Sequence, residues 1–130
     1  MTLSRTDSGK LARKLTALDK QVRDDMRAAL LQSGEQKYIE LAGSVHDEGD
    51  EAVANELIET GDALMERHLQ ELRAISTARE RLESGVIDLC DGCGGEIGLK
   101  RLLVYPVALR CVACQDRYEK THAHEAMPRL

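Results

Sequence analysis

Residues 90–114 read CDGCGGEIGLKRLLVYPVALRCVAC and hold all 4 cysteines of the chain. The cysteines form two Cys-x2-Cys pairs, Cys90 with Cys93 and Cys111 with Cys114, separated by seventeen residues. That spacing is typical of four thiolates arranged around one tetrahedral zinc ion. Four protein ligands leave no coordination position for substrate or water, so the sequence predicts one structural Zn²⁺ and no catalytic metal.

Two other uses of closely spaced cysteines compete with zinc, namely a rubredoxin-like iron site and a redox dithiol. The softness of the ligands and the reducing compartment expected for this chain favour zinc. Gly92 and Gly94 allow the tight turn around the first pair, and the second pair opens a predicted helix whose positive end favours thiolates. We therefore expect residues 87–130 to form a small C4 zinc-finger module that ends in a C-terminal helix.

The chain has 130 residues, which allows one ordinary domain and excludes a large multi-domain enzyme. Hydrophobic residues make up 42% of it, but Trp and Phe are absent, so any core is aliphatic. Charged residues reach 32% with a net charge of −5. This balance is typical of long solvated helices and argues against a self-sufficient DNA-binding protein.

Two stretches upstream of the cysteines carry apolar residues at helical spacing. The first stripe consists of Leu11, Leu15, Leu18, Val22, Met26 and Leu30. The second consists of Val53, Leu57, Leu64, Leu72, Ile75 and Leu82. Gly43 lies between the stripes and can adopt the left-handed conformation that ends a helix. The sequence thus predicts two long helices joined by a short turn.

The two stripes predict an antiparallel pairing, in which the numbers of facing residues add to a constant. They add to 93 or 94 for the pairs Leu41/Val53, Leu30/Leu64, Met26/His68, Val22/Leu72, Leu18/Ile75 and Leu11/Leu82. We expect a mainly α protein, with a long antiparallel coiled-coil helical hairpin over residues 1–86 in addition to the zinc finger. Because the stripes satisfy each other within one chain, we also expect a monomer.

The histidines carry no expected function. His68 falls within the predicted seam, where a lone histidine among leucines is more often a packed core residue than a ligand. His46, His122 and His124 have no spacing that predicts a metal site. We therefore interpret His68 as structural and assign no role to the other three.

Four carboxylates lie close together in the predicted hairpin turn, residues 43–52, within the sequence Asp47-Glu48-Gly49-Asp50-Glu51-Ala52. Helix capping alone explains the acids, with Asp47 as the N-cap and Asp50 three residues later. Capping does not explain why the cluster lies at the far end of arms about 50 Å long. That end is the one point able to enter a narrow channel in a large partner.

The hairpin, the Asp-x-x-Asp-x-Ala turn and the two cysteine pairs together resemble the DksA/TraR family of bacterial RNA polymerase secondary-channel regulators. The tip motif matches at Asp47, Asp50 and Ala52, and the zinc motif matches at all four cysteines. The resemblance implies a non-enzymatic regulator that binds RNA polymerase directly and modulates transcription initiation without reading DNA sequence. It implies that the hairpin enters the secondary channel and brings the tip near the catalytic centre.

One departure from the family pattern concerns guanosine tetraphosphate. Some members help to bind this nucleotide with basic residues immediately before the proline of the finger and immediately after its last cysteine. Tyr105 and Gln115 occupy these positions here, and neither supplies the charge that a pyrophosphate-rich nucleotide needs. The substitutions put dependence on guanosine tetraphosphate in doubt.

Two other functions compete with this interpretation. A free nucleic-acid-binding zinc protein needs a basic face and stacking aromatics, but residues 87–130 carry six basic and six acidic side chains. A transcript-cleavage-type factor would bind magnesium at an acidic tip to activate water, which Asp47 and Asp50 make chemically conceivable. The zinc finger, however, belongs with the non-cleaving family.

The sequence also predicts the location of the protein. Met1–Gly9 is polar and lacks the apolar region of a signal peptide. The longest apolar run, Leu102–Leu109, is too short to span a bilayer. We therefore expect a cytoplasmic protein that does not bind membranes.

Overall fold

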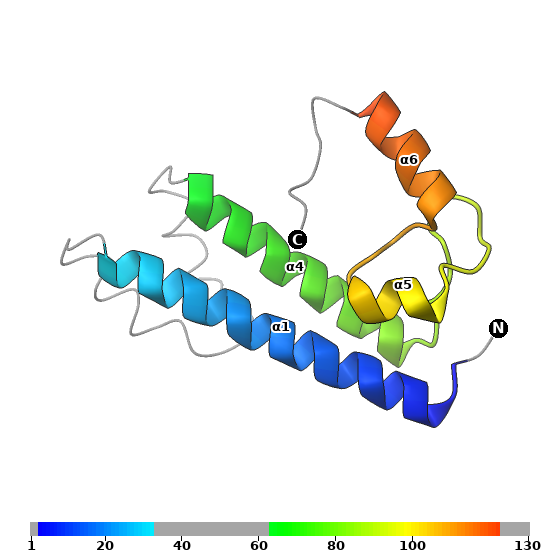
Figure 1. Cartoon of the computed structure of the whole chain (residues 1–130), viewed down its shortest axis with the longest axis horizontal. Coiled ribbons are helices and arrows are strands. Elements are labelled where there is room, and N and C mark those ends of the chain that lie inside the picture. Colours follow the sequence, from blue (N-terminus) through cyan, green and yellow to red (C-terminus); the bar gives the residue numbers. More distant parts are fainter. Residues whose placement is uncertain (1–2, 33–62, 123–130) are drawn as a thin grey trace. The chain divides into compact units, whose positions relative to one another are not determined.

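The computed structural model describes residues 3–32 and 63–122 of the chain (Figure 1). The helices of these residues are α1 (Arg5–Gln32), α4 (Ala63–Glu83), α5 (Leu99–Val104) and α6 (Val112–Thr121). The described ranges contain no strand beyond an isolated antiparallel bridge between Leu89 and Glu96. The predicted mainly α fold class is therefore confirmed.

The chain divides into two compact units, each of which takes a part of α1 and a part of α4. One unit combines Met1–Thr16 with Ala74–Leu130, and the other is Ala17–Arg73. In each unit the α1 part and the α4 part lie side by side and run in opposite directions (Figure 1). The antiparallel hairpin is thus confirmed for the parts of it that are described.

The beginning of α1 is fixed by a cap that the sequence analysis missed. The Ser4 hydroxyl accepts a hydrogen bond from the backbone N–H of Asp7 at 3.0 Å, and the Ser4 carbonyl accepts one from Ser8. A serine immediately before the first helical residue, followed by an acid at the third helical position, is a recognisable N-terminal signal. The helix therefore begins at Arg5, well before the first residue of the apolar stripe.

The buried face of α1 is the stripe that the sequence predicts. Leu11, Leu15, Val22, Met26 and Leu30 are all buried, and Leu18 is half-buried. Steps of four and three residues keep these side chains on one face of the helix, where burial removes their apolar surface from water.

The buried face of α4 differs from the prediction by about one residue in the unit Ala17–Arg73. Leu64 is 48% exposed, whereas Met65 and Leu69 are 2% and 6% exposed. The predicted pair Leu30/Leu64 is therefore wrong. If the helix face that contains Leu64 were buried, the polar imidazole of His68 would also lie in the seam. Burial of the face that contains Met65 and Leu69 instead removes two apolar side chains from water. Ile75, in the other unit, is buried as predicted.

His68 consequently lies beside the seam. Its side chain is 12% exposed, and its Nδ1 is 3.8 Å from the Glu71 carboxylate. Among the described residues Nδ1 has no hydrogen-bond partner. Nothing in this arrangement points to a ligand role.

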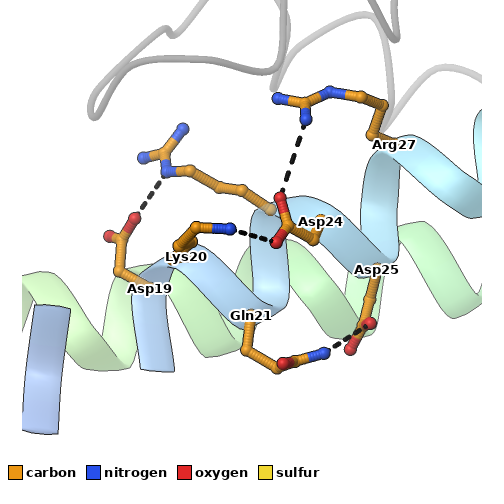
Figure 2. A network of polar contacts seen from close by, with 7 residues as sticks. Asp19, Lys20, Gln21, Asp24, Asp25 and Arg27 are labelled. Atoms are coloured by element: carbon orange, nitrogen blue, oxygen red, sulfur yellow. Dashed lines mark hydrogen bonds and ion pairs between the residues drawn. The ribbon is translucent and has the colours of Figure 1, made fainter. Parts of the chain in front are cut away.

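The solvent-facing side of α1 carries a chain of local polar contacts (Figure 2). Asp24 accepts the Lys20 ammonium at 2.7 Å and lies 3.6 Å from the Arg27 guanidinium, while Gln21 donates to Asp25 at 2.9 Å. The hydrogen bond from Lys20 lowers the pKa of the Asp24 carboxyl below its usual value. Pairs at this spacing each stabilise a helix by about 0.2–0.5 kcal/mol. None of the described helices has an apolar span that could cross a membrane.

The residues after α4 form a small apolar core around the cysteine pairs. Ile87, Ile97, Leu102, Val107 and Ala108 are buried. Leu102 lies on α5, and the others lie on the irregular segments before and after that helix. So few large side chains cannot stabilise an independent module. A bound metal would therefore contribute to the stability of this segment.

Candidate metal centre

The first cysteine pair lies in a tight turn that requires glycine at two positions. The Gly94 N–H donates to the Cys90 carbonyl at 3.0 Å, and the Cys90 N–H donates to the Gly95 carbonyl at 2.7 Å. Gly94 has φ of 74°, in the left-handed region that side-chain-bearing residues avoid. A Cβ on Gly92 would lie 3.1 Å from both Cβ and Sγ of Cys114, so any larger residue there would push the two pairs apart.

The second pair lies at the start of α6. Cys111 is the N-cap of that helix, with extended backbone angles, and Cys114 lies in its first turn. The Cys111 N–H donates to the Cys90 sulfur at 3.3 Å, and the Asp91 N–H donates to the Leu109 carbonyl at 2.7 Å. Backbone hydrogen bonds therefore hold the two pairs together in addition to any metal.

The four sulfur atoms form one cluster, in which all of them lie within 4.8 Å of one another. None of the cysteines forms a disulfide. A tetrahedral zinc with Zn–S bonds of about 2.3 Å places its sulfurs about 3.8 Å apart, so the cluster fits this ion. Cys90 and Cys114 are buried, Cys111 is half-buried and Cys93 is exposed.

Backbone N–H groups point at the sulfurs of the first pair. Cys90 accepts hydrogen bonds from Gly92 and Cys111, both at 3.3 Å, and Cys93 accepts one from Gly95 at 3.4 Å. Hydrogen bonds of this kind stabilise a thiolate relative to a thiol, as a metal ligand requires.

The thiols of the two pairs differ in acidity. Burial raises the pKa of Cys90, but backbone N–H groups, that of Cys111 foremost, outweigh burial and lower its pKa from 9.0 to about 6. The pKa of Cys114 is raised to about 12, because its thiol is hydrogen-bonded to Cys111 and because it is buried. Of the two buried cysteines, Cys90 thus has the lowered pKa and Cys114 the raised one.

Comparison with known proteins places the cluster in a family. Residues 82–120 match the prokaryotic dksA/traR C4-type zinc finger. Among solved structures, transcription factor DksA2 from Pseudomonas aeruginosa is 28% identical, with a TM-score of 0.56, over 92% of this chain and 84% of that chain. Residues 82–120 therefore form a zinc finger of the dksA/traR type, and the chain as a whole is similar to DksA2. No curated protein sequence matches this chain.

The C4 finger of this chain holds one structural zinc. All four cysteines of the chain lie within the matched range, and their sulfurs are the donor atoms that zinc prefers in closed sites. A closed thiolate set stabilises the folded finger and supplies no open position for chemistry.

Two arginines that sequence reasoning missed brace the DksA/TraR finger. Arg81, in the last turn of α4, donates to the carbonyl of Val86 at 3.2 Å and to that of Leu89. Arg101 on α5 donates through Nε to the carbonyl of Arg110 at 3.0 Å. A basic residue at a helix C-terminus is a weak signal for such a contact, because most of these residues face solvent.

A stack of side chains docks α6 against the loop that precedes it. The Arg110 guanidinium lies over the Tyr118 ring, 3.8 Å from its centroid, and its Nη2 is 3.8 Å from the Asp91 carboxylate. His122 stacks on Tyr118 with ring centroids 4.1 Å apart and planes 14° apart. His122, to which the sequence assigned no role, therefore has a packing role.

The tip residues Asp47, Asp50 and Ala52 lie outside the described residues, so the DksA/TraR tip remains a prediction. The two positions tied to guanosine tetraphosphate are described. Tyr105 has the Arg101 guanidinium 5.7 Å from its ring centroid, and Gln115 donates to the Glu119 carboxylate at 3.1 Å.

Proposed function

We propose that this protein is a transcription regulator that binds RNA polymerase directly and modulates initiation without sequence-specific DNA binding. The observation that carries the proposal is the combination of a C4 finger of the dksA/traR type with a similarity to DksA2 that extends over 92% of the chain. DksA2 is a transcription factor. If the two proteins shared only the finger, their structural similarity would not include the long helices.

The helical hairpin is, in this proposal, the part that enters the secondary channel of the polymerase. α1 has 28 residues and therefore a length of about 42 Å at the helical rise per residue. Most of its charged side chains face solvent, the largely buried pair Asp19 and Arg23 at 2.6 Å excepted, and its apolar stripe is buried. An antiparallel pair of helices with a polar outer surface suits a narrow aqueous channel.

We further propose that the hairpin, residues 1–86, delivers the acidic tip at 43–52, and that the finger, residues 87–130, supports its base. Cys90, Cys93, Cys111 and Cys114 are the proposed zinc ligands. Asp47, Asp50 and Ala52 are the proposed contacts near the polymerase active site. The regulator acts as a cytoplasmic monomer and, because Tyr105 and Gln115 lack positive charge, without a strong requirement for guanosine tetraphosphate.

Direct binding to purified bacterial RNA polymerase core enzyme tests the proposal. We expect the zinc-loaded protein to be retained by immobilised polymerase, and a photo-crosslinker at position 48 to react with the walls of the secondary channel. Crosslinks confined to the outer surface of the polymerase would refute insertion. Equal binding to free duplex DNA at moderate salt would favour the nucleic-acid-binding alternative, and RNA cleavage in stalled complexes would favour the cleavage factor.

A further inference from the structure

Arg117 contacts one sulfur of the metal centre directly. Its Nη2 lies 3.0 Å from Sγ of Cys114, which is buried in the first turn of α6. The two residues are three apart on the same helix, so their side chains lie on one face. The distance is shorter than the 3.3–3.4 Å of the backbone N–H contacts to Cys90 and Cys93.

Charge makes this contact different from the backbone contacts. Four thiolates around one Zn²⁺ carry a formal charge of −2, and backbone N–H groups add no net charge to the centre. The guanidinium is always protonated and contributes a full positive charge. A hydrogen bond between a cation and a thiolate at a partly buried site is stronger than one from a neutral amide.

Other cationic side chains of the finger contact groups other than the sulfurs. The Arg110 guanidinium lies over Tyr118, and Lys120 pairs with Asp116 at 3.1 Å on the exposed side of α6. Within the described part of the chain, Arg117 is therefore the cation that touches the sulfur cluster.

We propose that Arg117 is a positioning residue that retains the zinc. Its guanidinium holds the Cys114 sulfur in place and offsets half of the formal negative charge of the centre. Loss of partners that orient metal ligands typically lowers metal affinity by about 10- to 100-fold.

The test compares the full-length Arg117→Gln protein with Lys120→Gln. Both changes remove one positive charge from α6, but only Arg117 contacts sulfur. Competition with a chromogenic zinc chelator measures affinity and the rate of zinc release. We expect Arg117→Gln to bind zinc about 10-fold or more weakly than the wild type, Lys120→Gln to match the wild type, and Arg117→Lys to recover most of the affinity.

Two further measurements distinguish a direct effect on the metal from a general loss of structure. Circular dichroism of the zinc-loaded proteins should show equal helix content in all variants. In the Co²⁺-substituted proteins, the sulfur-to-metal charge-transfer bands should shift for Arg117→Gln and not for Lys120→Gln. Equal zinc retention by Arg117→Gln and Lys120→Gln would overturn the proposal. So would a loss of zinc that Arg117→Lys does not rescue and that follows a loss of helix.

Discussion

Arg81 donates a hydrogen bond to the backbone carbonyl of Leu89, the residue immediately before the first cysteine of the metal centre. The same guanidinium also holds the Val86 carbonyl. The last turn of α4 therefore fixes the path of the chain into the first cysteine pair, independently of the metal. Zinc and this arginine stabilise the same loop from its two ends.

Replacing Arg81 with Met should destabilise the folded protein, because two carbonyls lose a charged donor. We expect a decrease of about 1–3 kcal/mol in the free energy of unfolding. Arg73→Met is the matched control, because Arg73 is exposed on the same helix and its loss removes the same charge. Urea denaturation of the zinc-loaded proteins measures both, and equal stability of the two variants would contradict the bracing role.

The register of the hairpin predicts opposite outcomes for two adjacent residues. Met65→Ala should cost about 2–5 kcal/mol, because the side chain is buried and its removal leaves a cavity. Leu64→Ala should cost about 0.5 kcal/mol, because Leu64 is half-exposed. Thermal unfolding followed by circular dichroism distinguishes these values. A larger loss of stability for Leu64→Ala than for Met65→Ala would support the register that the sequence predicts.

Removal of one thiolate should release the zinc and loosen the finger. Native mass spectrometry should show one zinc per chain for the wild type and none for Cys111→Ser. Hydrogen exchange should then accelerate over residues 87–122 and change much less in the α1 segment, since the apolar seam and not the metal stabilises the hairpin. A folded, metal-free wild-type chain would refute the structural role of zinc.

Acid should weaken the finger over a defined pH range. The pKa of Cys90 is lowered from 9.0 to about 6 in the folded protein, so its thiolate contributes stability that is fully present above 9.0 and is lost as the pH falls through about 6. Zinc binding follows the same direction, since the ligands bind as thiolates. Zinc affinity, measured with a chelator calibrated at each pH, should fall across this range, and a constant affinity would exclude the effect.

The tip carboxylates can be tested apart from their capping role, because Asn is about as good an N-cap as Asp. Asp47→Asn and Asp50→Asn should change helix stability by about a few tenths of a kcal/mol. They should leave binding to RNA polymerase nearly intact and abolish the effect on initiation. If the double variant regulates a sensitive promoter as well as the wild type at matched occupancy, the carboxylates are only caps.

The sequence predicts correctly the features that depend on the spacing between residues of one type. The two Cys-x2-Cys pairs specify the metal centre, and the apolar stripe from Leu11 to Leu30 specifies the buried face of α1. The choice between Leu64 and Met65 is different, because both are apolar and only packing decides which faces the partner helix. In the sequence, single basic residues such as Arg81 and Arg117 resemble any solvated side chain, because the carbonyls and the sulfur that they contact are placed only by the fold.

The compact unit that contains the finger is discontinuous in the sequence, since it joins Met1–Thr16 to Ala74–Leu130. During synthesis the α1 part of this unit leaves the ribosome before the whole of Ala17–Arg73 has been made, and its packing partners follow only afterwards. Leu11 and Leu15 are buried in the complete unit, so they stay exposed to solvent until Ala74–Leu130 has been made. Burial of the finger's unit is consequently a late event that follows translation of most of the chain.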